Sequence, residues 1–453
     1  MRSFDLIIIG AGSGNSVIGP EHDSWDIAIV ERGLFGGTCL NVGCIPSKMF
    51  VYAAEVAELA DRVGPALGVH TRSDGADWAA IRDRVFDRID PIAEGGEEYR
   101  ESLDNITVFK NDARFVGPKQ LMVGDEIITA EHIVLAAGAR SFIPDIPGLS
   151  DTGFHTSDTI MRVENRPQRL LVIGGGYIAT ELGHVFSAFG SDVTFVLRSD
   201  RFLRGEDEAI SHRFTEIYTR EYDVRLRTEI HGARREGEEV ILDISTHGER
   251  SELRGDAILV ATGRIPNGDQ LDVAATGVAL DDDGYVISDS QLRTNVEGVW
   301  ALGDITSAVQ LKHAANHEAK VVAHNLVEPD NPIEVDDRYI PHAVFGHPQV
   351  AGVGLTERDC IAHGRPYISH VQEYCSAAYG WAMEDTDSFV KLIADPHTRL
   401  LIGAHIIGPQ APTLIQQLIQ GMVFGQTVDQ MAHGQYYIHP GLPEVVEQAL
   451  LEL

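Results

Sequence analysis

Residues 36–48 read GGTCLNVGCIPSK, and this stretch decides what kind of protein the chain can be. It holds two of the four cysteines, Cys39 and Cys44. Such a pair could be a structural disulfide, part of a metal site or a redox couple. A structural zinc site usually needs four ligands, and neither a CxxC nor a histidine pair accompanies these cysteines. The stretch therefore predicts no metal, and the choice between the other two depends on the compartment.

The N-terminus and the composition favour a cytoplasmic enzyme. MRSFDLIIIGAG has an apolar run of only four residues and no cleavage site, so it does not resemble a signal peptide. No apolar run approaches the ~20 residues that span a bilayer. A structural disulfide fits a reducing cytoplasm poorly, whereas a catalytic one is at home there. We therefore interpret Cys39 and Cys44 as a redox pair.

Cys44 also has the local context of a reactive thiol. Pro46 comes two residues later, and proline is favoured in the first turn of a helix. A thiolate at a helix N-terminus has a lowered pKa, and Lys48 would add positive charge. Thiol–disulfide exchange needs one thiol to attack and another to resolve the mixed disulfide, and this pair can supply both.

The whole chain has 453 residues, enough for about three domains of about 150 residues each. Its formal net charge is -32. Nucleic acids and anionic membranes bind basic surfaces, so neither is an expected partner. The composition is otherwise that of an ordinary globular protein.

Two strand–turn–helix patterns predict duplicated nucleotide-binding domains. The first is FDLIIIGAGSGNS, where Gly10, Gly12 and Gly14 follow a short apolar strand. A second strand, DIAIVE, ends at Glu31, whose carboxylate would bind a ribose hydroxyl. The usual third glycine of the pattern is replaced by Asn15, and the helix after it is short and broken by Gly19-Pro20.

The second pattern, RLLVIGGGYIATELGHVFSAFG, carries Gly174, Gly176 and Ala179. Here the second strand ends in Arg198, with Arg204 nearby, instead of an acid. Guanidinium groups pair with a 2′-phosphate that a carboxylate would repel. This copy therefore predicts NADPH in preference to NADH.

Five motifs in the same order make the chain resemble the flavin-dependent pyridine nucleotide–disulfide oxidoreductases along essentially its whole length. They are GGTCLNVGCIPSK, the two glycine turns, ATGRIPN with ALGD, and His439-Pro440 followed by Glu444. The resemblance implies FAD in the first domain, NADPH in the second, and a homodimer that reduces a small disulfide.

The resemblance also implies roles for individual residues. Cys39 would attack the substrate, Cys44 would lie nearer the flavin, and His439, held by Glu444 and supplied by the other subunit, would be the acid/base. Lys48 would pair with Glu181 beside the flavin, and Tyr177 would cover the nicotinamide pocket. The remaining cofactor residues would be Gly138, Gly303 and Asp304 for FAD and Gly263 for NADPH. Cys360 and Cys375 match no motif and are expected to be free thiols.

The implied fold is α/β, with two Rossmann-like dinucleotide-binding domains and a C-terminal α+β dimerisation domain. The predicted segments are 1–148 (FAD, first part), 149–268 (NADPH), 269–337 (FAD, continued) and 338–453 (interface). In the last segment, FVKLIA and LLIGAHIIG look like antiparallel strands, and LIQQLIQGMVFG and PEVVEQALLEL look like helices.

Substrate choice within the family is less directly encoded. Mercuric reductases carry a terminal cysteine pair, which this chain lacks. Lipoamide dehydrogenases normally use NAD, and glutathione reductases have substrate arginines that find no match in the first helix here; both stay as alternatives. The first helix, the YYIHPGLPEVVEQAL tail and the NADPH-type arginines resemble enzymes that reduce the disulfide of mycothiol, a cysteine joined to glucosamine and inositol. A remote alternative is a redox-sensing flavoprotein without turnover.

Overall fold

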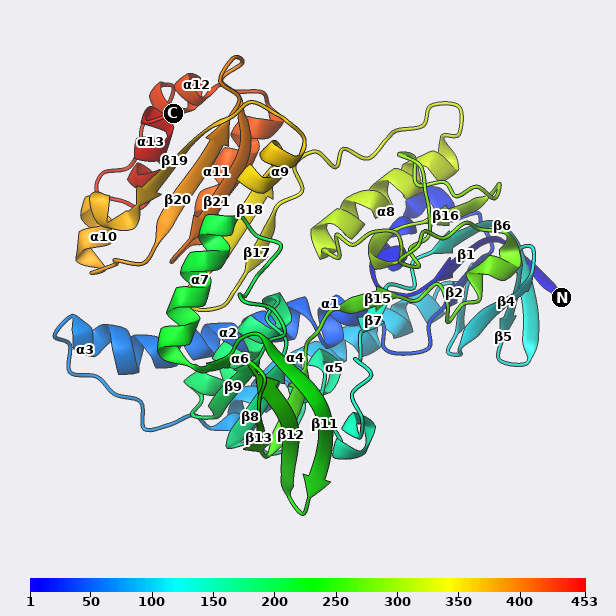
Figure 1. The fold of residues 1–453 in the computed structure, drawn as a ribbon. Helices are drawn as coiled ribbons and strands as arrows, with labels where there is room; N and C mark the ends of the chain where they lie inside the picture. Colours follow the sequence, from blue (N-terminus) through cyan, green and yellow to red (C-terminus); the bar gives the residue numbers. More distant parts are fainter. The chain divides into compact units, whose positions relative to one another are not determined.

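The computed structural model describes all 453 residues, which form two compact units (Figure 1). The first unit contains residues 1–49, 82–142 and 263–336, and the second contains residues 50–81, 143–262 and 337–453. The four-segment division expected from the sequence stays a prediction. Each unit is described by itself below.

The first unit is built on a sheet of order β3-β2-β1-β6-β5-β4, with β16 also paired to β6. Strands β3, β2, β1, β6 and β16 pair in parallel, and β4 and β5 extend the sheet in antiparallel fashion. The strands are Arg2–Ile9 (β1), Ile27–Val30 (β2), Ile106–Phe109 (β3), Ala113–Gly117 (β4), Gln120–Val123 (β5), Glu126–Leu135 (β6) and Val299–Ala301 (β16). The LIII run of β1 is buried on both faces, as a central parallel strand requires.

Helices and short elements accompany this sheet, and two of the helices, α2 and α4, extend into the second unit. The redox stretch forms α1 (Gly37–Asn41) and the start of α2 (Cys44–Glu58), which continues as a π-helix (Leu59–Val63) and α3 (Gly64–Ala66). The others are α4 (Trp78–Glu101), α8 (Lys312–Val327), the β7/β15 pair (Ala139–Ser141 and Arg264–Pro266) and short 3₁₀ turns. Helix α2 begins at Cys44 itself, as the proline two residues later led us to expect.

The second unit contains the second nucleotide-binding sheet, of order β10-β9-β8-β14 and parallel throughout. Its strands are Arg169–Ile173 (β8), Asp192–Val196 (β9), Asp223–Arg225 (β10) and Ala257–Val260 (β14). An antiparallel meander accompanies it: Thr228–Glu236 (β11), Glu239–Thr246 (β12) and Glu249–Gly255 (β13). The helices are Ser157–Ile160 (α5), Tyr177–Ala188 (α6) and Glu208–Glu221 (α7).

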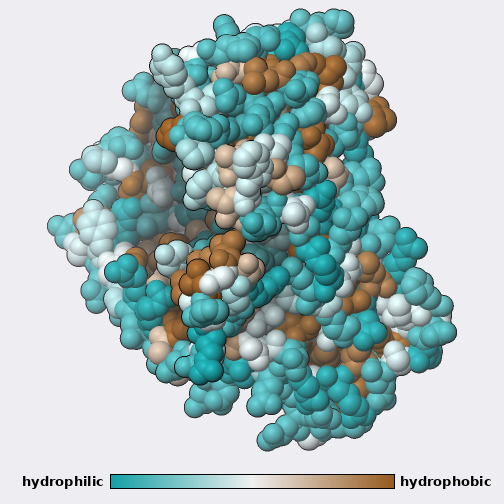
Figure 2. Space-filling model, turned by 90° about the vertical axis from the view of Figure 1, so that its left-hand side faces the viewer, coloured by the Kyte–Doolittle hydropathy of each residue, from teal (hydrophilic) through white to brown (hydrophobic).

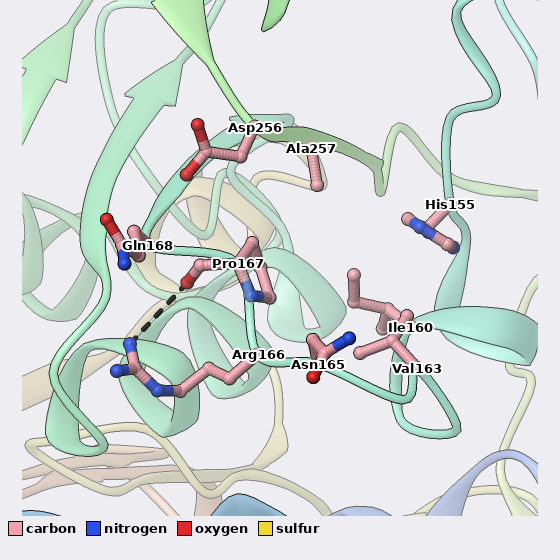
Figure 3. Close-up of a pocket in the computed structure, with 9 residues that line it drawn as sticks. All are labelled: His155, Ile160, Val163, Asn165, Arg166, Pro167, Gln168, Asp256 and Ala257. Atoms are coloured by element: carbon pink, nitrogen blue, oxygen red, sulfur yellow. Dashed lines mark hydrogen bonds between the residues drawn. The ribbon is translucent and has the colours of Figure 1, made fainter. Parts of the chain in front are cut away.

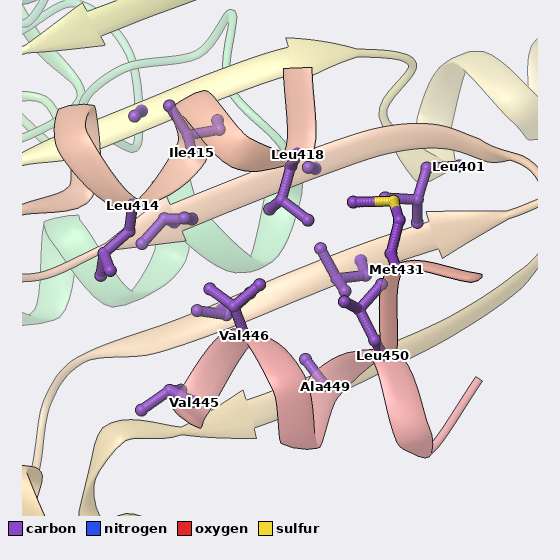
Figure 4. Packing of buried hydrophobic residues seen from close by; sticks show 14 of the residues in the cluster. Leu401, Leu414, Ile415, Leu418, Met431, Val445, Val446, Ala449 and Leu450 are labelled. Atoms are coloured by element: carbon purple, nitrogen blue, oxygen red, sulfur yellow. The ribbon is translucent and has the colours of Figure 1, made fainter. Parts of the chain in front are cut away.

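The C-terminal part of this unit is a five-stranded antiparallel sheet of order β17-β18-β21-β20-β19. Its strands are His342–Val344 (β17), Val350–Gly354 (β18), Ile368–Glu373 (β19), Phe389–Ala394 (β20) and Leu401–Ile407 (β21). Its helices are Glu357–Ala362 (α9), Ala378–Ala382 (α10), Ala411–Val423 (α11), Val428–His433 (α12) and Pro443–Leu451 (α13). Apolar side chains of α11 and α13 pack together with strand residues in one core (Figure 4). The strands and helices predicted for this region are confirmed.

The two nucleotide-binding turns lead into helices of different length. The second turn leads into α6, a regular helix of 12 residues. The first leads only into a 3₁₀ helix, Ser13–Val17, and a second short one, Pro20–His22. The short, broken helix expected from Gly19-Pro20 is therefore confirmed.

The face of the molecule drawn in Figure 2 is mostly hydrophilic. Hydrophobic residues lie on it in separate patches. None of the helices has the length and apolar character needed to cross a membrane.

Candidate active site

The two glycine turns have the same construction. Gly10 has a φ of +105°, and a Cβ at this position would lie 2.3 Å from the carbonyl oxygen of Ala136. Gly174 has a φ of +130°, and its Cβ would lie 2.2 Å from the carbonyl oxygen of Ala261. Both positions therefore exclude any residue but glycine. Each turn stands at the carboxyl end of parallel strands, where open α/β sheets bind nucleotides.

Two acidic residues of the first unit, Glu31 and Asp304, fit a role in binding FAD. Glu31 accepts hydrogen bonds from the Ala11 N–H (2.8 Å) and the Gly33 N–H (2.7 Å), which fix its carboxylate beside the turn. Burial raises the pKa of Asp304, against the opposing effects of the Arg264 charge, its own backbone N–H and the Lys312 charge. No side chain of the protein donates a hydrogen bond to this carboxylate. Its oxygens can therefore accept hydrogen bonds from the hydroxyls of a polyol such as the ribityl chain.

A buried arginine supports the shortened first helix. Arg100, at the end of α4, donates from Nε to Oδ1 of Asn15 (2.8 Å) and from Nη2 to the Asn15 carbonyl (2.9 Å). The residue that replaces the third glycine of the fingerprint therefore has a partner of its own. Arg100 is buried and forms no ion pair, and burial lowers its pKa.

The redox stretch is attached directly to this first turn. The N–H of Gly36 donates to the carbonyl of Ala11 (2.9 Å), and a Cβ on Gly37 would lie 2.8 Å from the Cα of Gly12. The backbone can approach this closely only because both residues lack a side chain. The glycines before the cysteines thus place α1 beside the FAD turn.

Cys39 and Cys44 lie close enough for their side chains to hydrogen-bond. This hydrogen bond lowers the pKa of Cys44 to about 7, against the effect of burial, and the charge of Lys48 lowers it further. The same hydrogen bond and burial raise the pKa of Cys39. Of the two thiols, Cys44 therefore takes the negative charge first, and Cys39 retains the proton.

This assignment predicts a pH profile for the reduced protein. Because a lowered pKa means that the thiolate forms as pH rises through that value, alkylation of Cys44 by iodoacetamide should increase with a midpoint near pH 7. Lys48→Met should move the midpoint upward, whereas Lys320→Met, a surface change, should not. Mass spectrometry of the Cys44 peptide gives the rate at each pH, with Cys375 as an internal reagent control. A midpoint at the ordinary thiol value of about 8.5 would contradict the assignment.

The second turn packs against the loop that carries the two predicted phosphate-binding arginines. A Cβ on Gly175 would lie 2.3 Å from Cδ2 of Leu197 and 3.3 Å from Cδ1 of Phe202. Leu197 immediately precedes Arg198. Both Arg198 and Arg204 are exposed and form no ion pair, whereas Arg201 between them binds Glu208. Two open cations beside a nucleotide turn are what a 2′-phosphate requires.

His439 and Glu444 form the predicted pair. The distance from Nδ1 of His439 to Oε1 of Glu444 is 2.7 Å, and the Gly441 N–H donates to Oε2 of the same carboxylate (3.1 Å). These two hydrogen bonds, that from His439 first, lower the pKa of Glu444. The His439 side chain is 73% exposed, so its Nε2 face is open to another molecule.

Comparison with known protein families shows which family the chain belongs to. Residues 4–319 match the family described as pyridine nucleotide-disulphide oxidoreductase, and residues 340–450 match its dimerisation domain. The chain belongs to this family. The predicted class of flavin disulfide oxidoreductase, its α/β fold with a dimerisation domain and its cofactors FAD and NADPH are thereby confirmed.

Individual relatives are similar to this chain over nearly its full length. A mycothione reductase of Mycobacterium tuberculosis (strain ATCC 25618 / H37Rv) is 47% identical over 100% of both chains. A dihydrolipoyl dehydrogenase of Haloferax volcanii is 32% identical over 98% of this chain and 95% of its own. Among solved structures, the Cu(II) complex of the HOCl-induced flavoprotein disulfide reductase RclA from Escherichia coli has a TM-score of 0.87 at 26% identity and covers both chains fully.

Some predicted site residues of the oxidoreductase belong to different units. Lys48 lies in the first and Glu181 in the second, so their pairing stays a prediction. Glu181 is buried in α6 and accepts a hydrogen bond from the Phe345 N–H (2.9 Å). Tyr177 is exposed at the start of α6, and Ala179 is buried in the same helix.

The remaining predicted cofactor residues occupy turns or tight packing. Gly14 fits beside Ile8, because a Cβ there would lie 2.9 Å from the Ile8 side chain. Gly176 precedes α6 as its N-cap. Positive φ angles occur at Gly138, Gly263 and Gly303. Their contacts with a cofactor stay predictions. Of the two other cysteines, Cys360 is buried and Cys375 is exposed, and both are free thiols as expected.

Two residues of α8 reach the FAD turn region and were not found from the sequence. Lys312 donates from Nζ to Oγ of Ser13 (2.9 Å), and its charge favours the thiolate of Cys39. Glu318 accepts a hydrogen bond from the Gly303 N–H (2.6 Å). The only available signal was their position in a polar helix soon after the ALGD motif, which does not by itself indicate a cofactor contact.

A cavity of about 380 Å³ lies elsewhere in the oxidoreductase (Figure 3). Its lining includes Gln168, next to the first residue of β8, and Ala257, the first residue of β14. It therefore opens at the amino-terminal edge of the second nucleotide sheet, opposite the Gly174 turn. Because such sheets bind ligands at the carboxyl edge, we assign this cavity no part in the reaction.

Proposed function

We propose that the protein is an NADPH-dependent reductase of mycothiol disulfide, acting through Cys39 and Cys44. One observation carries this choice of substrate: identity of 47% to a mycothione reductase extends over the full length of both chains. Identity to the dihydrolipoyl dehydrogenase of Haloferax volcanii is 32%. The proposal includes the cytoplasmic location expected from the sequence, since a cycling disulfide needs a supply of NADPH.

Features of the chain support a substrate that is mostly sugar. The segment after the first glycine turn reads NSVIGPEHDSWD and contains no arginine, so it offers no bidentate partner for a carboxylate such as those of glutathione. The neutral hydroxyls of a sugar are bound by hydrogen bonds and do not require arginine or lysine partners.

The chemistry follows from the two thiols and one base. The Gly10 turn and Glu31 would hold FAD, which would supply the transfer of two electrons from NADPH to the Cys39–Cys44 disulfide. The Cys39 sulfur then attacks one sulfur of mycothiol disulfide, which forms a mixed disulfide and releases one mycothiol thiolate. Cys44 attacks the Cys39 sulfur, which releases the second mycothiol and restores the Cys39–Cys44 disulfide. Both mycothiols leave as thiols after receiving protons.

His439 would provide the proton transfers. The raised pKa of Cys39 means that its proton needs an acceptor, and the imidazole held by Glu444 is suited to take it and then protonate the leaving thiolate. Its 73% exposure fits use outside its own chain, and a dimerisation domain contains it. We therefore propose that Cys39 is served by His439 of the partner subunit.

The exposed arginines predict a measurable nucleotide preference. Replacing both (Arg198→Ala with Arg204→Ala) should raise the KM for NADPH by at least about 100-fold, because each lost charge-assisted hydrogen bond contributes about 1.5–3 kcal/mol. The KM for NADH should change by no more than about twofold, since NADH has no 2′-phosphate. Arg201→Ala, which removes an arginine already paired with Glu208, is the matched control. Equal effects on both nucleotides would contradict the roles of the two arginines.

Substrate choice is tested with three disulfides side by side. Purified flavin-loaded protein is assayed for NADPH oxidation with mycothiol disulfide, glutathione disulfide and lipoamide, and each assay is repeated with NADH. The proposal predicts efficient turnover with mycothiol disulfide and NADPH. Turnover with lipoamide and NADH would indicate a dihydrolipoyl dehydrogenase. Turnover with none of them, although NADPH reduces the flavin, would favour the redox-sensing alternative.

A further inference from the structure

The loop between β9 and α7 is held at one end by the second nucleotide turn. The N–H of Leu203 donates to the carbonyl of Gly175 (2.8 Å), and Phe202 packs beside the same glycine. Leu203 has a φ of +48°, which a leucine adopts only when its surroundings require it. The next residue is Arg204. Its backbone is therefore anchored to the turn on its N-terminal side.

The other end of the loop is held by the dimerisation-domain sheet. Asp207 is fully buried, and its Oδ1 accepts a hydrogen bond from Nζ of Lys391 on β20 (2.7 Å). Lys391 also binds Oε2 of Glu357, at the start of α9 (2.6 Å). Oδ1 of Asp207 in addition caps α7 through the Ala209 N–H (3.0 Å). One buried ammonium thus joins the loop, a strand and a helix.

Two further contacts connect the same loop to the dimerisation domain, one from the helix α9 and one from the strand β17. Nη1 of Arg358 on α9 donates to the carbonyl of Arg204 itself (3.3 Å). Nε2 of His342 on β17 lies 2.8 Å from Oε2 of Glu206. The side chain of Arg204 is exposed, but its backbone carbonyl is bound by Arg358. The nearby acids Glu206 and Asp207 are also bound by residues of the dimerisation domain, so the backbone around Arg204 is fixed.

Lys391 points away from the hydrophobic core because side chains alternate between the two faces of a strand. Val390 and Leu392 of β20 belong to the core beneath α11 and α13, so Lys391 between them points to the opposite face. Its direct partner on β21 is His405, which is also buried. Burial alone would lower the pKa of Lys391, but its hydrogen bonds to Asp207 and Glu357 raise it. The charged lysine is stabilised in this place by two carboxylates, Asp207 from the loop and Glu357 from α9.

We propose that Lys391 and Arg358 are positioning residues of the NADPH site: by fixing the backbone around Arg204, the dimerisation-domain sheet sets how well the enzyme distinguishes NADPH from NADH. This inference rests on the role proposed above for Arg204. A loop free to move would still carry the cation but would hold it less often at the 2′-phosphate.

The test compares two small probes that differ only in the 2′-phosphate. Binding of 2′,5′-ADP and of 5′-AMP to the flavin-loaded enzyme is measured by calorimetry for Lys391→Met, Arg358→Ala and Arg204→Ala. Arg365→Ala, an exposed arginine just beyond α9, is the matched control. The ratio of the two affinities should fall about tenfold in Lys391→Met and about threefold in Arg358→Ala, from the loss of a charged and of a weaker hydrogen bond. Affinity for 5′-AMP and the ratio in Arg365→Ala should not change.

The outcomes distinguish the inference from the role on which it rests. An unchanged ratio in both Lys391→Met and Arg358→Ala, with a reduced ratio in Arg204→Ala, would overturn the inference alone. An unchanged ratio in Arg204→Ala would instead refute the role of that arginine, and the inference with it. Equal loss of both probes would indicate a purely structural role and would also overturn it. If Lys391→Met does not fold, Arg358→Ala decides, because its side chain is exposed.

Discussion

Replacement of Cys39 by serine is expected to reduce disulfide turnover by about 10³-fold or more, while NADPH still reduces the bound flavin. Cys39 supplies the sulfur that attacks the substrate, and a serine hydroxyl cannot form the mixed disulfide. NADPH oxidation requires only the nucleotide sites, which this change does not touch. Rapid-mixing measurement of flavin bleaching, beside steady-state turnover, distinguishes the two steps.

The control for this variant is another cysteine. Cys375 is an exposed free thiol outside the redox stretch, so Cys375→Ser should keep full turnover. Normal turnover in the Cys39 variant would show that the substrate is attacked by a different group. Loss of flavin reduction as well would show that Cys39 supports the cofactor site and would remove its separate role.

Replacement of His439 by alanine is expected to slow the disulfide-reducing step by about 10²–10⁴-fold, the usual contribution of general acid–base catalysis. Flavin reduction by NADPH should keep its rate, because no proton transfer at Cys39 is needed for it. His433→Ala, which removes another exposed histidine in the same region, is the matched control. Equal slowing of both steps would contradict the assigned role.

The same variant tests the shared active site. Mixed dimers formed from Cys39→Ser and His439→Ala chains contain one site with an intact Cys39 from one chain and an intact His439 from the other. Such mixtures should recover turnover that neither parent shows. No recovery, in dimers proven to be mixed, would mean that each chain uses its own histidine.

The parts of the site that the sequence could predict are those encoded within a few residues. Gly10 and Gly174 must be glycine because a Cβ would strike a backbone carbonyl, and this constraint follows directly from a short motif. The His439–Glu444 pair spans five positions and a single turn into α13. Constraints of this kind can be recognised in a short sequence motif. The fold class could be predicted because the strand–glycine turn–helix motif occurs twice in the chain.

The parts that could not be predicted join residues distant in the chain. Lys312 and Ser13 are 299 positions apart, and Lys391 and Asp207 are 184 apart. A lysine inside the run FVKLIA gives no sign of its partner, because any buried acid could compensate its charge. The role of Arg100 could not be predicted either, although its partner Asn15 is a clear departure from the dinucleotide-binding motif. Only the packed structure defines these pairs.

Trapping the mixed disulfide would identify the sulfur that attacks the substrate. A Cys44→Ser, Cys375→Ser protein cannot resolve an adduct and lacks the other exposed thiol, so mycothiol disulfide should leave one mycothiol bound to Cys39, located by peptide mass spectrometry. We expect this adduct at Cys39, and we expect none when Cys39 is also replaced. No adduct at Cys39, in protein whose thiol is shown to be reduced, would contradict the proposed attack on mycothiol disulfide.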